Sequence, residues 1–364
     1  MATAQERVSD SRNRQRTALF SSSPRGFKPF PTAANPAPDL PNFESRSIFV
    51  ASIFLSEEIM ILVAGATGVL GSEIVRRLTA RGEKVRAMVR VTSAPEKVDR
   101  LKALGAEIVR ADVKEPATLQ AACAGTDAVI STITTILTSQ PGDSFEATDG
   151  EGTKSLIDAA KKAGASKFVF VSFDTTKAGD NPLTKAKREV EEHLKQSGLD
   201  YTILHSTLFC ESWLGSMLFA DPVACTAKVY GKGTEKLRYV AVADVAEFAV
   251  QSLTNPIAHN ATIPIGGPDE ISQRDAVRLF EEAYGKKFSV IEVPEAALEA
   301  QWSSAQNPFD KTFAGLMLGV ARGFDSGMQP PFDKFPMQMT CPRDFVKKQA
   351  RAAGYSGASV HELR

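Results

Sequence analysis

The chain has 364 residues, 43 of them Lys or Arg and 43 Asp or Glu, so its formal charge is zero. A chain without net charge has no overall field that attracts nucleic acid, and we expect no nucleic-acid partner. The four cysteines and four histidines show no C-x-x-C and no close histidine pair, which predicts neither a disulfide scaffold nor a metal site. No apolar run reaches the roughly 18 residues that span a bilayer, so we expect no membrane partner.

Residues 1–59 differ from the rest of the chain. They are rich in Pro, Ser and Arg and lack hydrophobic periodicity, which predicts a disordered or non-native N-terminal extension. Three interpretations stay open: the natural protein starts at Met60, the segment is a transit peptide, or it is a regulatory tail. Met60 opens the first apolar run, and the arginines near the N-terminus suit a transit peptide, whereas the acidic residues among them do not.

From Met60 the pattern becomes regular. Apolar runs predict strands at 60–64, 84–89, 107–111, 127–131, 167–172 and 201–205. Helical periodicity lies between them at 70–81, 95–104, 116–123, 146–163 and 184–197. This alternation predicts an α/β fold in which residues 60–206 form a doubly wound, parallel Rossmann sheet. The ligand crevice of such a sheet lies at the carboxyl ends of its strands.

Beyond residue 206 the alternation loosens. Helices are expected near 209–219, 243–254, 271–284, 294–304, 308–321 and 342–353, and short strands near 237–241, 261–265 and 288–293. The pattern predicts that residues 207–364 form a smaller C-terminal substrate lobe, with some elements returning to the Rossmann sheet.

A glycine-rich turn follows the first strand directly and opens a helix. It consists of Gly65, Ala66, Thr67, Gly68, Val69, Leu70 and Gly71. Gly65 suits a tight turn, Gly68 lets the backbone approach a pyrophosphate, and Gly71 allows close packing of helix on strand. The helix N-terminus adds free N–H groups and a positive dipole end. The turn therefore predicts a dinucleotide site.

The second strand is followed by Arg90, where an NAD-preferring site would carry an acidic residue. Because a guanidinium fork suits a 2′-phosphate, we expect NADP(H), with NAD(H) the less favoured cofactor. Asp112 follows the third strand and either accepts from the adenine amino group or caps a helix. Ser131, Thr132 and Thr134 follow the fourth strand and face the crevice by topology.

Lys187 shares a helical stripe with Leu183, Val190 and Leu194. A lysine on a core-facing stripe needs a partner or a ligand, and we favour the nicotinamide ribose. The alternative is a lysine that extends along apolar surface to solvent.

Several motifs resemble the NmrA-like branch of the atypical short-chain dehydrogenase/reductases. They are GATGVLG at 65–71, Arg90, ADV at 111–113, GTKSLIDAAKKAGASKFVFVS at 152–172 and KREVEEHLKQSGLDYTIL at 187–204. The resemblance implies an NADP-binding core, a cytoplasmic location and cofactor contacts at Asp112 and Val113. It also matches Lys187 to the family lysine and places Ser172 near the nicotinamide.

The sequence departs from that family at two positions. Leu183 stands where most short-chain reductases carry a tyrosine proton donor, four residues before Lys187. His205 and Ser206 replace the usual Arg-Pro, so His205 is either a substitute acid or a histidine satisfied by local hydrogen bonds. The catalytic candidates are therefore Lys187, Ser172 and His205. Farther along the chain, apolar residues recur at helical spacing at Phe209, Trp213 and Met217, and they form either a lid over the substrate or a core stripe.

Two functional hypotheses follow. The first is an NADPH-dependent reductase acting on a small conjugated acceptor such as a quinone, because a hydroquinone anion needs no positioned acid to be protonated. The second is a redox sensor that binds NADP(H) without turnover, which the missing tyrosine favours. We expect a cytoplasmic protein, or an organellar one if residues 1–59 are a transit peptide; the sequence leaves the oligomeric state open.

Overall fold

The computed structural model describes residues 59–355, apart from 138, 177–178, 216–217, 326–327 and 329. Its centre is a parallel seven-stranded sheet in the order β11-β6-β5-β4-β1-β2-β3. The strands are β1 (Met60–Ala64), β2 (Lys84–Val89), β3 (Glu107–Arg110), β4 (Ala128–Ser131), β5 (Lys167–Ser172), β6 (Asp200–Ser206) and β11 (Ala261–Ile265). The predicted α/β class and doubly wound parallel sheet are confirmed.

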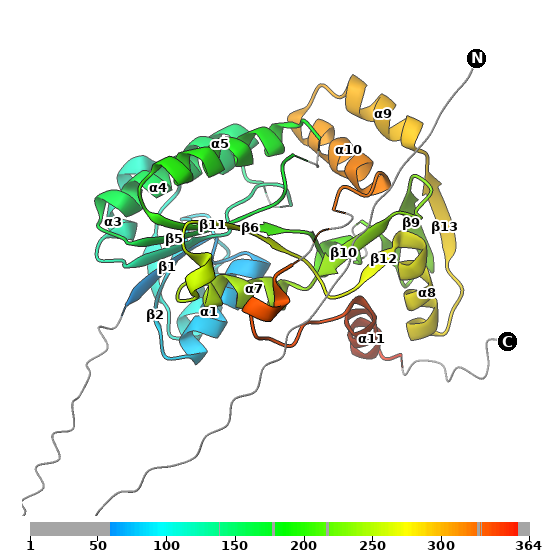
Figure 1. The fold of residues 1–364 in the computed structure, drawn as a ribbon, viewed down its shortest axis with the longest axis horizontal. Helices are drawn as coiled ribbons and strands as arrows, with labels where there is room; N and C mark the ends of the chain where they lie inside the picture. The colour runs from blue at the N-terminus through cyan, green and yellow to red at the C-terminus, as the bar shows by residue number, and fades with distance from the viewer. Residues whose placement is uncertain are drawn as a thin grey trace, which may run out of the picture. The chain divides into compact units, whose positions relative to one another are not determined.

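Helices cover both faces of this sheet (Figure 1). One layer contains α3 (Pro116–Cys123), the π-helix η1 (Phe145–Gly152), α4 (Thr153–Lys162) and α5 (Pro182–Gln196); the opposite layer contains α1 (Val69–Ala80), α2 (Pro95–Ala103) and α7 (Val242–Gln251). The strands are apolar throughout because both faces are buried. In β1, for example, Ile61 and Val63 pack towards α1 and α7, while Leu62 and Ala64 pack towards α3 and α4.

The rest of the described chain forms two three-stranded sheets, β12-β10-β7 and β13-β9-β8, with helices packed on them. The strands are β7 (Leu208–Phe209), β8 (Ala220–Asp221), β9 (Thr226–Tyr230), β10 (Lys236–Val240), β12 (Glu270–Ser272) and β13 (Ser289–Val293). The remaining helices are α6 (Cys210–Trp213), η2 (Pro256–Ala258), α8 (Gln273–Tyr284), α9 (Glu295–Ser304), α10 (Pro308–Ala321), η3 (Phe332–Lys334) and α11 (Pro342–Ala352). Of these, η2 and η3 belong to the apolar cluster of the central sheet rather than to that of the smaller sheets. One late element, β11, pairs with β6 at the edge of the central sheet.

The helix expected at 209–219 is wrong. The backbone is extended at Phe209, which pairs with Val240 of β10, and the helix ends at Trp213. Strand pairing therefore outweighs the helical spacing of the apolar side chains, and Phe209 and Trp213 do not form a stripe on one helix. Met217, the third residue of that stripe, lies outside the described residues. The helix expected at 146–163 divides into η1 and α4.

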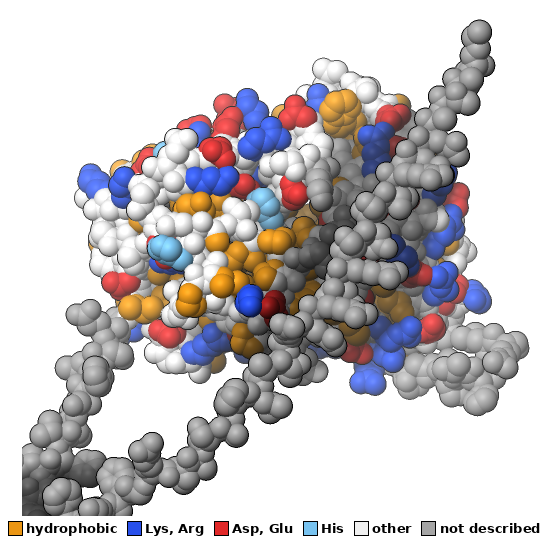
Figure 2. Space-filling model, viewed as in Figure 1, with side chains coloured by type: hydrophobic (Ala, Val, Ile, Leu, Met, Phe, Trp, Pro, Cys, Tyr) orange, Lys and Arg blue, Asp and Glu red, His pale blue; other side chains and the backbone are white. Residues whose placement is uncertain are grey.

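Charges of both signs intersperse over the face shown in Figure 2. This distribution matches the zero formal charge of the sequence. None of the helices in the described ranges is long and apolar enough to cross a bilayer. The same residues contain no group of three or more His, Cys, Asp or Glu that can hold a metal ion.

Candidate functional site

The glycine-rich turn joins β1 to α1 at the carboxyl edge of the central sheet. Gly65 has a φ of +82°, a conformation that L side chains rarely adopt. A Cβ on Gly71 would lie 2.2 Å from the Gly65 carbonyl oxygen, so the helix can approach the turn only without a side chain there. Gly68 is exposed and precedes the first turn of α1, which has neither a side-chain cap nor an acidic residue. The turn thus presents bare backbone and unscreened N–H groups, which fit an anionic phosphate.

The other members of the turn divide between core and surface. Ala66 is fully buried and Leu70 is 9% exposed, whereas Val69 is 70% exposed. Thr67 is half-buried. The apolar residues anchor the turn, while the exposed ones leave its outer side open to a ligand.

Arg90 is the first residue after β2, at the same edge of the sheet. Its Nη1 donates to Asp143 Oδ2 at 2.8 Å, and Lys114 Nζ donates to Asp143 Oδ1 at 2.7 Å. Burial would raise the pKa of Asp143, but the hydrogen bonds from Lys114 and Arg90 outweigh it and lower that pKa. The loop between β4 and η1 therefore places an ionised carboxylate beneath two cations.

Asp112 follows β3 and does not cap a helix. Its Oδ1 accepts from the Lys114 backbone at 2.9 Å, and the N-cap of α3 is Glu115. Its neighbour Val113 is 4% exposed, and its side chain would meet a Cβ on Gly152. Asp112 is thus held at the strand end as a turn residue, with Val113 as its anchor in the core.

Ser131 and Thr132 lie where β4 ends. Thr132 Oγ1 donates to the Ala64 carbonyl oxygen at 3.1 Å, which ties this loop to β1 just before the glycine-rich turn. Ser131 is fully buried, and its hydroxyl has no hydrogen-bond partner among the described residues. A buried polar atom without a partner marks a position where a ligand or water is needed.

Lys187 is buried on α5, 4% exposed, together with the apolar residues of its stripe. Its Nζ donates to the Ile133 carbonyl oxygen at 3.0 Å and lies 4.7 Å from the centre of the Phe170 ring. Burial lowers the pKa of Lys187, while the charges of Asp149 and Glu191 oppose this shift. The lysine does not extend along the surface to solvent; it is fixed beneath the carboxyl ends of β4 and β5.

Asp149 lies on the π-helix η1 and faces Lys187. Thr135 donates to Asp149 Oδ2 through its N–H at 3.1 Å and its hydroxyl at 2.8 Å. The other oxygen, Oδ1, lies 3.9 Å from Lys187 Nζ and accepts no hydrogen bond from the described residues. Burial raises the pKa of Asp149, opposed by Lys187 and Thr135. The wider turn of a π-helix changes the direction in which its side chains point, and π-helices are often found at functional sites.

A second buried carboxylate, Glu191 on α5, connects the ends of β5 and β6. Glu191 Oε1 accepts from Ser172 Oγ at 2.6 Å and lies 3.0 Å from His205 Nε2. Ser172 and His205 are register partners on neighbouring strands, so their side chains share the face covered by α5. His205 therefore makes the local hydrogen bond that the sequence analysis gave as the alternative to a substitute acid. The contact with Glu191 also fixes Nε2 as the ring nitrogen that faces the core.

Leu183, at the position where most short-chain reductases carry a tyrosine, packs in an apolar cluster. It is 3% exposed and shares the cluster with Phe145 and Ala186; Ile136, Phe173 and Phe309 pack against it. The rings of Phe145 and Phe309 lie 4.5 Å apart. The position beside Lys187 is thus occupied by hydrocarbon and aromatic surface.

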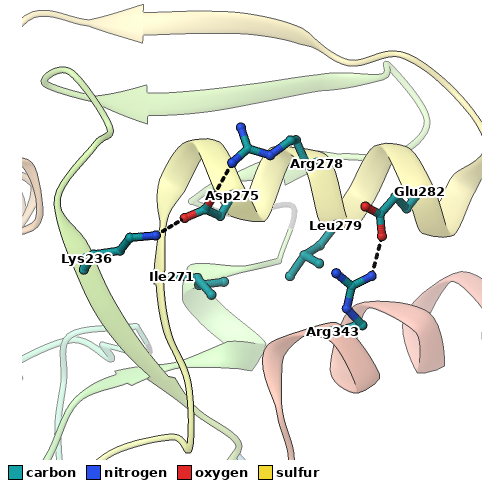
Figure 3. Close-up of a pocket in the computed structure, with 7 residues that line it drawn as sticks. All are labelled: Lys236, Ile271, Asp275, Arg278, Leu279, Glu282 and Arg343. Carbon is teal, nitrogen blue, oxygen red and sulfur yellow. Dashed lines mark hydrogen bonds and ion pairs between the residues drawn. The ribbon is translucent and has the colours of Figure 1, made fainter. Parts of the chain in front are cut away.

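A separate pocket of about 250 Å³ lies between α8 and α11 (Figure 3). Its charged residues pair with one another: Lys236 with Asp275 at 2.5 Å, and Arg343 with Glu282. None of the residues predicted to bind a dinucleotide lines it. We therefore place the candidate site at the carboxyl edge of the central sheet.

Sequence reasoning missed the three carboxylates of this edge: Asp143, Asp149 and Glu191. Glu191 follows Lys187 by four residues on α5, a spacing that places both on one helix face and was available from the sequence. Asp143 and Asp149 carry no such signal, because only the path of the loop after β4 brings them to Arg90 and Lys187.

Comparisons with known proteins identify the family and the fold of the chain. The model described as NmrA-like family matches residues 57–318. The chain is 32% identical over 288 residues to Photosystem II assembly factor Ycf39 of Cyanophora paradoxa, which covers 77% of this chain and 88% of that protein. It is 30% identical over 237 residues to NAD(P)H azoreductase of Xenophilus azovorans, an alignment that covers 64% of this chain and 77% of that protein.

A solved structure, AtPrR2 with NADP+ and (+)pinoresinol, has the same fold. It aligns with a TM-score of 0.68 and 21% identity over 80% of this chain and 99% of that one. Because the family model spans most of the chain and the fold is a Rossmann sheet with a glycine-rich turn, this protein belongs to the NmrA-like family.

Proposed function

We propose that the protein is an NADPH-dependent reductase of a small conjugated acceptor such as a quinone. The observation that carries this proposal is the buried Lys187, held by a backbone carbonyl and facing the Asp149 carboxylate at the strand ends beyond the glycine-rich turn. A fully buried lysine is costly to maintain unless it serves a ligand or a partner.

The residues present fit a nicotinamide dinucleotide. The turn from Gly65 to Gly71 would hold the pyrophosphate, Arg90 the 2′-phosphate and Asp112 the adenine amino group, with Val113, Ser131 and Thr132 along the same edge. Lys187 would donate to the nicotinamide ribose, because its ammonium has N–H groups left beside the bond to Ile133. When bound, the reduced nicotinamide supplies a hydride.

The acceptor would lie against the apolar cluster around Leu183. Phe173 and Ile136 of this cluster are half-buried, so they can offer apolar surface to a flat ring. Leu183 has no proton to donate. A ketone would need a positioned acid to neutralise the alkoxide, whereas the hydroquinone anion is protonated by solvent. The apolar cluster therefore favours a quinone or a similarly activated acceptor.

Ser172 and His205 act through Glu191 in this proposal. Because the Ser172 hydroxyl donates to Glu191, its lone pairs are left to accept from a carboxamide N–H group. With Nε2 of His205 engaged by Glu191, Nδ1 is the ring nitrogen left to exchange a proton with the acceptor. These assignments remain predictions for mutagenesis.

The second candidate is an NADP(H)-binding protein without turnover. Two observations favour it: Leu183 stands in place of tyrosine, and relatives such as Ycf39 of Cyanophora paradoxa are named assembly factors. In this case the dinucleotide would report redox state to a protein partner.

Titration of the full chain with NADPH and NADH, followed by nicotinamide fluorescence, separates these candidates. A small quinone is then added to the NADPH complex and absorbance is recorded. If the protein is a reductase, we expect tight NADPH binding and rapid oxidation of the bound NADPH. Lys187→Ala should abolish this oxidation. The control Lys185→Ala, which removes a side chain that is 74% exposed on the same helix, should leave it unchanged. Tight binding without oxidation by several quinones and enones would support the second candidate, and preference for NADH would contradict the role of Arg90.

Domain organisation and location complete the proposal. We propose that residues 60–206 bind the dinucleotide and that 207–364 supply a substrate lobe. The cytoplasm is the expected location; the chloroplastic relative from Arabidopsis thaliana, 32% identical over 240 residues, supports the organellar alternative. Imaging a fluorescent fusion with and without residues 1–59 distinguishes the two, because only a transit peptide would change location on removal.

A further inference from the structure

We propose that Lys114 joins Arg90 in a two-cation site for the 2′-phosphate of NADP(H), and that Asp143 is the positioning residue that orients both. This inference rests on the proposed dinucleotide binding and adds to it two residues that the sequence did not indicate. It makes the loop between β4 and η1 part of the selection of NADP(H) over NAD(H).

The Asp143 carboxylate is the centre of the cluster. Its side chain is fully buried and accepts four hydrogen bonds. The donors are Arg90 Nη1 at 2.8 Å, Lys114 Nζ at 2.7 Å, the Gln140 N–H at 2.9 Å and Thr148 Oγ1 at 3.4 Å. Such a carboxylate fixes the position of two otherwise flexible cations.

The cations themselves are not fully buried. The side chain of Arg90 is 28% exposed and that of Lys114 is 23% exposed. Within the described residues, the Arg90 guanidinium donates one N–H to Asp143. The Lys114 ammonium contacts only Asp143 and, at 3.9 Å, Asp112. Because a guanidinium has five N–H donors and an ammonium three, each keeps donors for an anion.

Topology places this cluster at the adenosine end of the expected dinucleotide. β2 lies beside β1, which carries the glycine-rich turn, and β3 lies beside β2. Arg90 follows β2 directly and Lys114 comes four residues after the end of β3. Both therefore sit at the carboxyl edge, on the side of the turn away from Lys187 on α5, where the ribose that bears the 2′-phosphate is expected.

An internal carboxylate near a phosphate site has two opposite possible effects. It can compete with the phosphate for the cations, or it can hold them in place. The second is favoured here because Asp143 is buried and already accepts four hydrogen bonds, while the cations keep partly exposed surface. The two effects predict changes of opposite sign when Asp143 is removed.

The test is direct binding, by calorimetry on the full chain, of NADPH, NADH, 2′,5′-ADP and AMP. We expect Lys114→Ala to weaken NADPH and 2′,5′-ADP about tenfold, the effect of one charge-assisted hydrogen bond, with NADH and AMP unchanged. Asp143→Ala should weaken the same two ligands by at least as much. Lys102→Ala, which removes a 59% exposed lysine on α2, is the matched control and should change none of them.

The outcomes separate the inference from the function beneath it. Unchanged NADPH and 2′,5′-ADP affinity in Lys114→Ala overturns the two-cation site while NADPH binding itself stands. Tighter NADPH binding by Asp143→Ala identifies a competing carboxylate and overturns its positioning role. Retained NADH binding shows that a variant is folded, and absence of binding of either dinucleotide by the wild-type chain overturns the proposed function together with this inference.

Discussion

Replacing Asp149 by Asn tests the buried pair with Lys187. The two charged atoms lie 3.9 Å apart. At an effective dielectric constant of about 20 this separation corresponds to about 4 kcal/mol, and removing one partner of a buried pair generally costs about 3–5 kcal/mol. Asn can still accept from Thr135, but its amide then directs N–H donors towards the ammonium. Lys187 can lose its proton, which limits the penalty of an unpaired buried charge. We therefore expect the lower end of this range, a loss of about 3 kcal/mol in the free energy of unfolding near pH 6.

The loss should depend on pH. Burial already lowers the pKa of Lys187, and Asp149 opposes this shift. In Asp149→Asn the folded-state pKa falls further below its unfolded value, so the folded lysine binds fewer protons and stability rises more steeply with pH. The stability difference from wild type is therefore greatest near neutral pH and shrinks towards pH 10.

Equilibrium urea unfolding of the full chain, followed by tryptophan fluorescence at several pH values, measures this effect. Asp158→Asn is the matched control, because Asp158 is a 64% exposed carboxylate on α4 that pairs with His193. It should change stability by no more than about 0.5 kcal/mol. If Asp149→Asn behaves like this control at every pH, the pair carries no ionic attraction in the folded protein and our reasoning fails.

Three further substitutions test other parts of the fold. Gly71→Ala should lower the free energy of unfolding by about 1–3 kcal/mol and abolish NADPH binding, since its Cβ would lie 2.2 Å from the Gly65 carbonyl oxygen. The control is Gly319→Ala in α10, where the nearest atom to the new Cβ lies at 3.7 Å; thermal melts should show no destabilisation of this variant. Glu247→Gln should lower the free energy of unfolding by about 1–2 kcal/mol, because Glu247 accepts from Arg77 of α1 and from Arg81, the residue that follows this helix. These hydrogen bonds outweigh burial and lower the pKa of Glu247, so the wild-type advantage should fade as acid titrations pass below about pH 4.5. Burial raises the pKa of Asp325 to about 7, so wild-type stability falls as pH rises from about 4 to 7, and Asp325→Asn should gain relative to wild type over that range in urea titrations. A flat difference across pH 4–7 would contradict this assignment.

The sequence alone determined the central sheet and its glycine-rich turn. Six strands and the helices between them follow from apolar runs and helical periodicity, because a parallel sheet buried on both faces requires continuous apolar strands. Gly65 and Gly71 were interpretable one by one, since a positive φ and a close helix approach each exclude side chains. The stripe that contains Lys187 was also visible, because helical spacing alone fixes which residues share a face.

Only the tertiary structure decided what these residues touch. The expected helix at 209–219 gave way to strand pairing of Phe209 with β10, a partner distant in sequence. Asp143 and Asp149 reach Arg90 and Lys187 through the loop and π-turn after β4, and no periodicity encodes such a path. Local patterns specify elements and faces, whereas the partners of a buried charge depend on how the whole chain closes around it.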